Sequence, residues 1–296
     1  MIDNKLLTLI TLSENGSYTK TAEILHLTQP AVSQHIHGLE KELGIVIFNR
    51  TENGLKPTPQ GIIAIRYAKR IQALYELEKT RIEDSKKNMF SFTIGITHTS
   101  ESSGVSNALA EYAYSTAGLH ITIISDDIIN LYTKLENYEI DLAIIEARNT
   151  DPRYRSVLLD TDSLMLAVSA TNPLAKKSVV TIEELKKQKM ILRLPGSATR
   201  QLFEATLASE DLTIKDFNVI LEVDSIATIK DLVIKDIGVA VLARSTCRNL
   251  ELLNKLVLLP IEGMPMIREV NIVYPKDFDH PEVLDGIVKS YKKVNK

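Results

Sequence analysis

Residues 28–40, TQPAVSQHIHGLE, have the pattern of an amphipathic helix with an unusual outer face. Val32, Ile36 and Leu39 recur at helical spacing, so we expect them to point into a core. The opposite face presents glutamines, a serine and a histidine, whereas glutamate and lysine are the usual residues on a solvated helix. This composition indicates that the outer face binds another molecule.

The segment before this helix predicts a second short helix, over residues 18–25. Ser17 is a suitable N-cap for that helix. Thr28 is a suitable N-cap for the helix that follows, and Pro30 lies in its first turn, where a missing N–H is tolerated. Two helices joined by a turn of three or four residues form a helix-turn-helix unit. The sequence therefore predicts such a unit near the N-terminus.

The outer face of the second helix has the chemistry that reads DNA bases. Side-chain amides can bond bidentately to adenine, serine hydroxyls can serve a base or a phosphate, and proline can contact a thymine methyl. A helix-turn-helix presents the first half of its second helix to the major groove. The alternative is an ordinary polar surface on a helical bundle, which this stretch alone does not exclude. The candidate base-reading residues are Gln29, Pro30, Ser33, Gln34 and His37.

Two further elements follow the helix-turn-helix. The segments IVIF and LKPT flank NRTENG, which predicts a small hairpin or wing with its turn at Asn53-Gly54. Residues 59 to about 87 then predict one helix that is too long for an average core helix. Its apolar residues, among them Ile71 and Leu74, have no obvious partner in their own domain. We therefore expect this helix to face another subunit.

From residue 89 the pattern changes to alternating strands and helices. Helical patterns such as 102–115 and 226–235 separate most of the apolar, β-rich segments. This alternation predicts a parallel or mixed sheet between layers of helices, and the strand candidates suit two α/β lobes better than one sheet. The strand candidates are 92–96, 120–125, 140–146, 164–169, 190–194, 219–223, 238–243 and 270–274.

Composition places the chain among globular proteins. Its 296 residues are 44% hydrophobic and 25% charged, without an apolar run of 18 residues or a basic signal segment at the start. The single Cys247 excludes an internal disulfide, so a soluble protein of the reducing cytoplasm is expected. Residues 1–88 carry 12 lysines and arginines against 10 acidic residues, and residues 89–296 carry 23 against 28. This mild asymmetry permits a nucleic-acid partner at the N-terminus without requiring one.

The N-terminal motifs together resemble the DNA-binding domain of LysR-type transcriptional regulators. The matching features are GSYTKTAEIL, LTQPAVSQHIHGLEKELG, IFNR and LKPTPQG, all within residues 6–62. Further along the chain, RLPGSATRQLFE and EVDSIATIKDLVIKDIGVAVLARS resemble segments of the family's ligand-sensing domain. The resemblance therefore covers essentially the whole chain.

The resemblance implies an α+β multidomain regulator. Its parts would be a winged helix-turn-helix domain, a dimerising linker helix, and a two-lobed α/β effector-binding domain like a periplasmic binding protein. Family members are usually tetramers that bind partly dyad-symmetric operators and respond to a small molecule. The expected partners are double-stranded operator DNA, further copies of the chain in a homodimer or homotetramer, and RNA polymerase if the protein is an activator. The expected bounds are 1–58 for the DNA-binding domain, 59–88 for the linker helix and 89–296 for the effector-binding domain, with lobe 1 at about 89–161 and 267–296 and lobe 2 at about 162–266.

Carried onto this chain, the family's base-reading region falls on residues 29–34. Ser17 and Thr19 match positions near the phosphates, and Arg50 matches the arginine of the wing. The chain departs from the family pattern in having Thr21 where an alanine is usual. Its recognition helix is also poor in arginine and lysine, so phosphate attraction must come from other basic residues and from helix N-termini. The full set of DNA-binding candidates is Ser17, Thr19, Lys20, Thr28, Gln29, Pro30, Ser33, Gln34, His37 and Arg50.

Polar residues at the ends of predicted strands indicate a ligand site in the effector-binding domain. In open α/β folds, ligands gather at the carboxyl ends of strands, where helix N-termini offer free N–H groups. HTSE at 98–101 and GSATR at 196–200 are two such junctions, which we expect to face each other across the interlobe cleft. Taken singly, Thr99 and Ser225 are better explained as helix N-caps, and only their convergence across a cleft would make them a site. The effector-binding candidates are Thr97, His98, Thr99, Ser100, Ser125, Asp126, Thr199, Arg200, Ser225 and Ile226.

The chemistry of these junctions suits a small anionic effector, because hydroxyls and N–H groups are joined by the cationic Arg200. Glu101 would instead suit an amino group, so an amino acid is the second choice. An α/β enzyme or a solute-binding protein with an N-terminal interaction domain are the alternatives. The first is opposed by the absence of Walker, GxGxxG, HExxH and CxxC motifs, and the second by the missing signal sequence. We expect no catalytic residue, cofactor, metal site or membrane partner.

Overall fold

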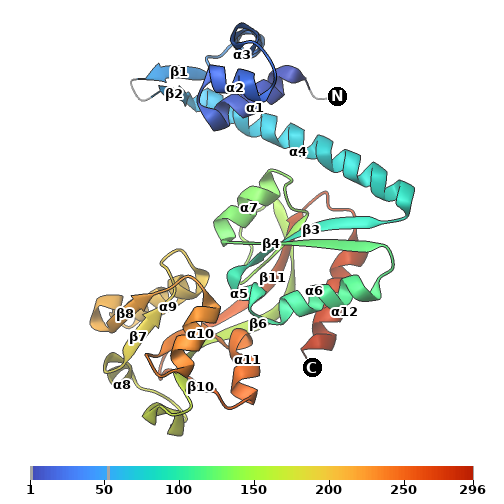
Figure 1. Ribbon diagram of the computed structural model, residues 1–296. Helices are drawn as coiled ribbons and strands as arrows, with labels where there is room; N and C mark the ends of the chain where they lie inside the picture. Colours follow the sequence, from blue (N-terminus) through green and yellow to red (C-terminus); the bar gives the residue numbers. More distant parts are fainter. Residues whose placement is uncertain (1–2, 52–53, 296) are drawn as a thin grey trace. The chain divides into compact units, whose positions relative to one another are not determined.

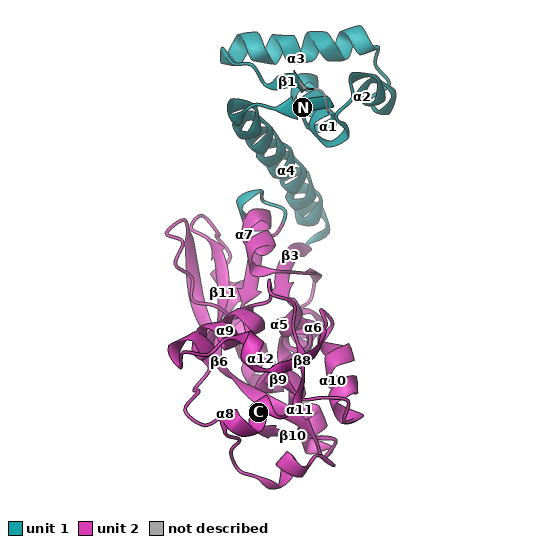
Figure 2. Cartoon of the chain, turned by 90° about the vertical axis from the view of Figure 1, so that its left-hand side faces the viewer, with its two compact units in different colours: residues 1–88, 136–139 teal, residues 89–135, 140–296 magenta. Residues whose placement is uncertain are grey.

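The structure is a computed structural model that describes residues 3–51 and 54–295. The chain divides into two compact units (Figure 2). Each unit has at least one hydrophobic cluster of its own. Within the described ranges, no helix is both long enough and apolar enough to cross a membrane. The units are residues 1–88 with 136–139, and residues 89–135 with 140–296.

A helical bundle opens the first unit (Figure 1). Helices α1 (Asn4–Asn15), α2 (Tyr18–Ile24) and α3 (Gln29–Leu43) are joined by short turns, and Leu9 and Ile36 meet in their core. The side chain of the residue before each helix accepts a hydrogen bond from the first turn, which satisfies an N–H group that the helix leaves free. The predicted helix-turn-helix is therefore confirmed as α2 and α3.

A hairpin and a long helix complete the first unit. Strands β1 (Phe48–Thr51) and β2 (Gly54–Pro57) pair antiparallel and form the predicted wing, while the expected turn residue Asn53 lies outside the described residues. Helix α4 (Pro59–Lys87) is 29 residues long, as its unbroken pattern predicted. A Cβ on Gly61 would lie 2.1 Å from a backbone carbonyl oxygen, so the first turn of α4 tolerates no side chain there.

Parallel strands form the first lobe of the second unit. Strand β3 (Phe90–Thr97) lies between β4 (Leu119–Asp126) and β5 (Leu142–Ile145) and is parallel to both. Successive side chains of β5 enter two different hydrophobic clusters, because neighbouring residues of a strand point to opposite faces. Helices α6 and α12 lie side by side in one of these clusters and α7 lies in the other (Figure 1). The helices of this lobe are α5 (His98–Glu101), α6 (Gly104–Ser115), α7 (Ile128–Glu136) and α12 (Pro281–Val294).

The second lobe is built on shorter strands. Strands β9 (Ala240–Ala243) and β10 (Leu256–Leu259) are antiparallel to the end of β6, and β7 (Lys189–Leu192) is parallel to β8 (Asn218–Glu222). Their side chains pack with those of the surrounding helices into two further clusters. The helices are η1 (Pro173–Lys176), α8 (Ile182–Lys186), α9 (Ala198–Ser209), η2 (Ile214–Asp216), α10 (Ile226–Ile234) and α11 (Arg244–Leu252).

Two long strands connect the lobes. Strand β6 (Tyr154–Ser169) pairs with β11 (Ile267–Pro275) as far as Ser163, and from Leu164 onward it pairs with β9 and β10 instead. The resulting sheet is mixed and serves two lobes, as predicted, but it is one continuous sheet of seven strands, whereas the sequence favoured separate lobes over a single sheet. The reason is that β6 is long enough to pair in both lobes. The first half of β6 and the elements β10, α11 and α12 were not predicted from the sequence.

Candidate functional site

Helix α3 separates a buried face from an exposed face, as its sequence predicted. The side chains of Val32 and Ile36 are in the core, whereas Gln29, Pro30 and Gln34 are exposed. Within the described part of the chain, Gln34 makes no hydrogen bond to another residue. Its amide donors and acceptor are therefore available to an external molecule. Ser33 and His37, the other two candidates, are partly buried and exposed, respectively.

Three of the polar candidates make contacts inside the fold. The hydroxyl oxygens of Ser17 and Thr28 each accept a backbone N–H from three residues further on, at 3.3 Å, so both residues are N-caps. His37 Nδ1 lies 3.1 Å from a carboxylate oxygen of Glu40. The capping hydroxyls sit at helix N-termini, where further N–H groups remain free to bind an anion such as a phosphate.

Basic residues lie exposed around this helix-turn-helix. Lys20 and Arg50 are exposed, as is the neighbouring candidate Thr19. Arg50 forms no ion pair within the described residues. Thr21, the departure from the family pattern, is fully buried and its hydroxyl has no hydrogen-bond partner. The first unit thus presents to solvent a helix face rich in amides and a wing arginine without an ion-pair partner. Inside the unit, the Thr21 hydroxyl has no hydrogen-bond partner.

A cleft of about 480 Å³ lies between the two lobes of the second unit. It is bounded by residues that follow strands β3, β4, β5, β7 and β8 and by the N-terminal turns of α7 and α9. This is the position at which open α/β sheets bind ligands. The lining residues are Thr97, His98, Thr99, Asp126, Asp127, Ile128, Ile129, Glu146, Ala147, Arg193, Leu194, Gly196, Ser197, Ala198, Gln201 and Asp224.

Glu146 is a buried carboxylate in this lining, and only 5% of it is exposed. Its two oxygens accept hydrogen bonds from the hydroxyls of Thr97 and Ser100, each at 2.5 Å. Among the described residues it forms no ion pair with a basic side chain. Thr97 also caps the short helix α5 by accepting the N–H of Ser100 at 3.1 Å. The hydroxyl-rich end of β3 therefore holds a negative charge at the cleft wall.

Arg193 faces the same cleft from the other lobe, with 3% of its side chain exposed. Its Nη2 donates to Asp224 at 3.2 Å, but its Nε and Nη1 have no hydrogen-bond partner. Burial lowers the pKa of the Arg193 guanidinium, and the carboxylates of Asp224 and Glu146 offset part of this effect. A buried donor without an acceptor is unfavourable by about 1–3 kcal/mol, and more for a charged group. The cleft wall therefore contains a guanidinium with two nitrogens that lack hydrogen-bond acceptors.

Asp126 lies at the end of β4 and is held by its own helix turn. Burial raises the pKa of its carboxyl, but hydrogen bonds from Asn130 and from the backbone of Asp127 outweigh this. The Lys134 ammonium, 3.7 Å away, acts in the same direction. The net result is a lowered pKa, so Asp126 is an anion at neutral pH.

Arg200 is not free to bind an anionic ligand, contrary to the expectation from the sequence. Its side chain is 6% exposed and bonds to Glu204 and Glu222, and its Nη1 also donates to the Arg193 carbonyl oxygen at 3.2 Å. These partners satisfy the guanidinium inside its own lobe. Arg193, seven residues earlier at the end of β7, is the cation that lines the cleft.

The other candidates divide in the same way. Thr97, His98, Thr99 and Asp126 line the cleft together. Sequence reasoning missed Glu146, Arg193, Gln201 and Asp224, although three of these four follow strands and could have been found by the strand-end rule. The candidates outside the lining are Ser100 and Ser125, which neighbour it, Thr199 and Arg200 in the buried first turn of α9, Ser225 as the N-cap of α10, and the buried Ile226.

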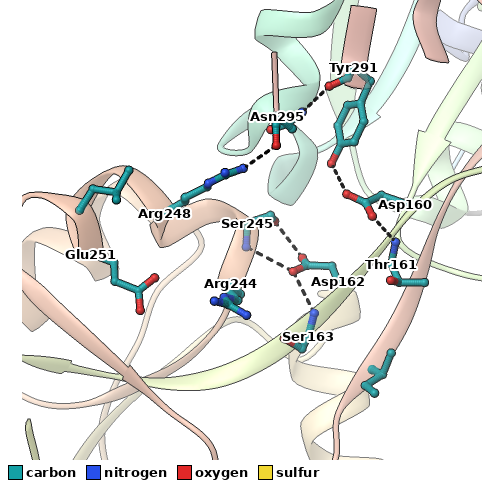
Figure 3. Close-up of a pocket in the computed structure, with 12 residues that line it drawn as sticks. Asp160, Thr161, Asp162, Ser163, Arg244, Ser245, Arg248, Glu251, Tyr291 and Asn295 are labelled. Atoms are coloured by element: carbon teal, nitrogen blue, oxygen red, sulfur yellow. Dashed lines mark hydrogen bonds between the residues drawn. The ribbon is translucent and has the colours of Figure 1, made fainter. Parts of the chain in front are cut away.

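A second cavity, of about 510 Å³, lies beside the point where β6 passes between the lobes (Figure 3). Its side chains bond to one another: Tyr291 donates to Asp160 at 2.9 Å and Ser245 donates to Asp162 at 2.8 Å. Arg248 donates to a backbone carbonyl at the end of α12. Among the described lining residues, none has a buried polar atom without a partner. The interlobe cleft is therefore the stronger candidate for a ligand site.

Two protein-family models match the chain. The model described as bacterial regulatory helix-turn-helix protein, lysR family, matches residues 4–62, and the model described as LysR substrate binding domain matches residues 90–293. The first match contains α2, α3 and the wing, and the second contains both lobes and the cleft.

Known proteins with regulatory names are similar over nearly the whole chain. The probable RuBisCO transcriptional regulator of Thalassiosira pseudonana is 28% identical over 282 residues, covering 93% of this chain and 91% of that protein. The HTH-type transcriptional regulator CysL of Bacillus subtilis is 26% identical over 276 residues, covering 91% and 89%. Among solved structures, full-length CbnR complexed with its target DNA has a TM-score of 0.71 at 16% identity, covering 99% of this chain and 100% of that one. This last likeness shows a shared fold.

Proposed function

The chain belongs to the LysR family of bacterial regulatory helix-turn-helix proteins, and we propose that this member responds to a small ligand held between its two lobes. Proteins of this family are transcriptional regulators with a DNA-binding and an effector-binding domain, not enzymes. The finer assignments that follow are the operator-reading residues, the effector site and the assembly.

We assign base reading in a partly dyad-symmetric operator to the exposed start of α3. The free amide of Gln34 and the exposed Gln29 and Pro30 support this assignment, because an amide can distinguish adenine in the major groove. Arg50 on the wing is assigned to the phosphate backbone, since it is exposed and has no ion-pair partner within the described residues. Ser17 and Thr28 contribute through the helix N-termini that they cap.

Replacing Gln34 with alanine separates base reading from general DNA affinity. We expect Gln34→Ala to weaken operator binding by roughly 1–3 kcal/mol and to leave random-sequence binding nearly unchanged. Arg50→Ala should weaken both and lower the slope of affinity against salt by about one. Fluorescence anisotropy with the chain's own upstream DNA and a scrambled fragment measures this, with Gln188→Ala in the second unit as control. Equal losses on both fragments for Gln34→Ala would refute the assignment.

We assign the effector site to the interlobe cleft, and Arg193 is the single observation that carries this proposal. Two of its three guanidinium nitrogens are buried and lack acceptors in the described structure. A ligand carboxylate or oxyanion placed against Nη1 would supply a charged acceptor to one of these two nitrogens. The anionic group that the sequence predicts for the effector is therefore retained, with Arg193 rather than Arg200 as its partner.

Thermal shift tests this site directly. A panel of carboxylic acids, inorganic oxyanions and amino acids should include a compound that raises the melting temperature of the full-length protein. Arg193→Gln should weaken its binding by at least about tenfold, because charged hydrogen bonds are lost. Arg244→Gln is the matched control, since Arg244 is an exposed arginine of the second cavity. Stabilisation that Arg193→Gln leaves intact would place the effector elsewhere.

The assembly is proposed to be a homodimer or homotetramer joined through α4. Ile63, Tyr67, Ile71 and Leu74 are exposed at helical spacing on this helix, and such a stripe is typical of a helix that packs on another helix. The proposal keeps the domain bounds at 1–58, 59–88 and 89–296. Because the protein regulates transcription, it is assigned to the cytoplasm, with RNA polymerase as a further partner if it activates.

A further inference from the structure

The charges around the interlobe cleft are unequal. Asp126, Asp127, Glu146 and Asp224 line it, against the single guanidinium of Arg193. Asp224 is paired with Arg193 at 3.2 Å, and Asp126 lies 3.7 Å from a lysine outside the lining. Asp127 and Glu146 therefore have no cation at ion-pair distance among the described residues, although the Glu146 charge is close enough to Arg193 to raise the pKa of its guanidinium. An anion without any positive charge would meet a net repulsive field on entering this cleft.

Glu146 has acceptor capacity that the fold does not use. Each of its oxygens accepts one hydroxyl, from Thr97 or Ser100, whereas an ionised carboxylate offers about four lone-pair sites. The carboxylate is 5% exposed and no basic residue pairs with it in the described chain. A buried charge of this kind is normally paired, so a cationic donor from a ligand would complete its surroundings.

Building on the proposed effector site, we propose that the effector is a zwitterion of the amino-acid class. Its carboxylate accepts from Nη1 of Arg193 in the second lobe, and its ammonium donates to Glu146 in the first lobe. One molecule would thereby supply an acceptor to an unpartnered donor of Arg193 and a cationic donor to the Glu146 carboxylate on the opposite wall. A cleft of about 480 Å³ has ample room for an amino acid. Because the two groups belong to different lobes, such a ligand would also fix the lobes relative to each other.

Matched probes decide between a zwitterion and a simple anion. Each of the twenty standard L-amino acids is compared with its deaminated acid and its decarboxylated amine, by thermal shift and titration calorimetry on the full-length protein. We expect at least one amino acid to bind, and its two truncated partners to bind at least about tenfold more weakly. This comparison uses the unaltered chain, so it does not depend on the folding of any variant.

Variants then assign the two walls. Glu146→Gln keeps the shape and an acceptor oxygen but removes the charge, so it should weaken the amino acid by at least about tenfold and erase its advantage over the deaminated acid. Arg193→Gln should weaken both ligands, and Arg244→Gln should weaken neither. The melting temperature without ligand shows whether each variant is folded.

Three outcomes would overturn the inference. A deaminated acid that binds as well as its amino acid, an amino acid unaffected by Glu146→Gln in a folded variant, or the absence of any response across the amino acids would each do so. If an acid binds in an Arg193-dependent manner, the zwitterion is refuted while the effector site stands. If binding is independent of both Arg193 and Glu146, the proposed effector site fails as well.

Discussion

Arg193 and Arg200 are seven residues apart in the sequence and differ in their hydrogen-bond partners. Arg200 bonds to two glutamates and a carbonyl, so its charge is neutralised where it lies. Arg193 has one aspartate partner and two bare nitrogens. In a protein interior a guanidinium without acceptors persists only where other interactions fix it, and functional sites are where such groups are found. The pair shows that the partners of a side chain, and not its charge alone, indicate function.

Thr21 is a second polar group that the fold leaves unsatisfied, and it has no outlet to a ligand. Its hydroxyl is fully buried in α2 without a hydrogen-bond partner. Valine has the same shape, so Thr21→Val should stabilise the first unit by about 1 kcal/mol by removing the unpaired hydroxyl. Chemical denaturation of the full-length protein measures this. Thr19→Val, at an exposed position of the same helix, is the control and should change little. Destabilisation by Thr21→Val would indicate that the hydroxyl has a partner after all.

At the level of single residues, sequence rules placed the exposed polar side chains well and the buried ones poorly. The face of α3 follows from the spacing of Val32 and Ile36. The position of Arg193 in the cleft lining does not follow from spacing, because RLPGSATR contains two arginines that the sequence pattern does not distinguish. Only the neighbours brought by the fold, Glu222 and Asp224, distinguish them.

Among the elements, β6 shows why part of the fold escaped prediction. Most residues of its first half are exposed, without a regular alternation, and aspartates and serines occur among them, so no apolar run reveals a strand. That half is stabilised by pairing with β11, more than a hundred residues later. The second half is buried on both faces and reads as the apolar run LMLAVS. The local sequence pattern therefore predicted the buried second half of β6 and missed the first half, which depends on pairing with the distant strand β11.

Helix α4 has an apolar face that does not pack against the rest of its own unit, as its sequence pattern predicted. In its own unit it buries only Gly61 and Ala68, while Ile71 and Leu74 are 46% and 43% exposed. Replacing both exposed residues with glutamate should give a species of lower mass, because two charges per chain would enter a helix–helix contact. Light scattering with operator binding measures this. Gln72→Glu with Thr80→Glu, the same charges on the same helix, is the control. An unchanged mass would place the contact on another element.

For the whole molecule, the two compact units imply that unfolding is not a single step. The first unit has one hydrophobic cluster, and the second has its own clusters on both sides of β6. Units with separate cores need not melt together. The family's two tasks therefore rest on parts whose stabilities can be changed one at a time.

Calorimetry with one variant in each unit tests this separation. Thr21→Val should raise only the transition of the first unit, by a few degrees. Asp162 is buried where β6 changes lobes, and it accepts a hydrogen bond from Ser245 of α11 (Figure 3). It also accepts one from Arg268 of β11. Asp162→Asn would leave the Arg268 guanidinium buried without its counter-ion, a loss of about 3 kcal/mol, and should lower only the transition of the second unit. Additive shifts are expected in the double variant, since the two sites share no partner. A single transition that both substitutions move would show instead that the chain unfolds as one cooperative body.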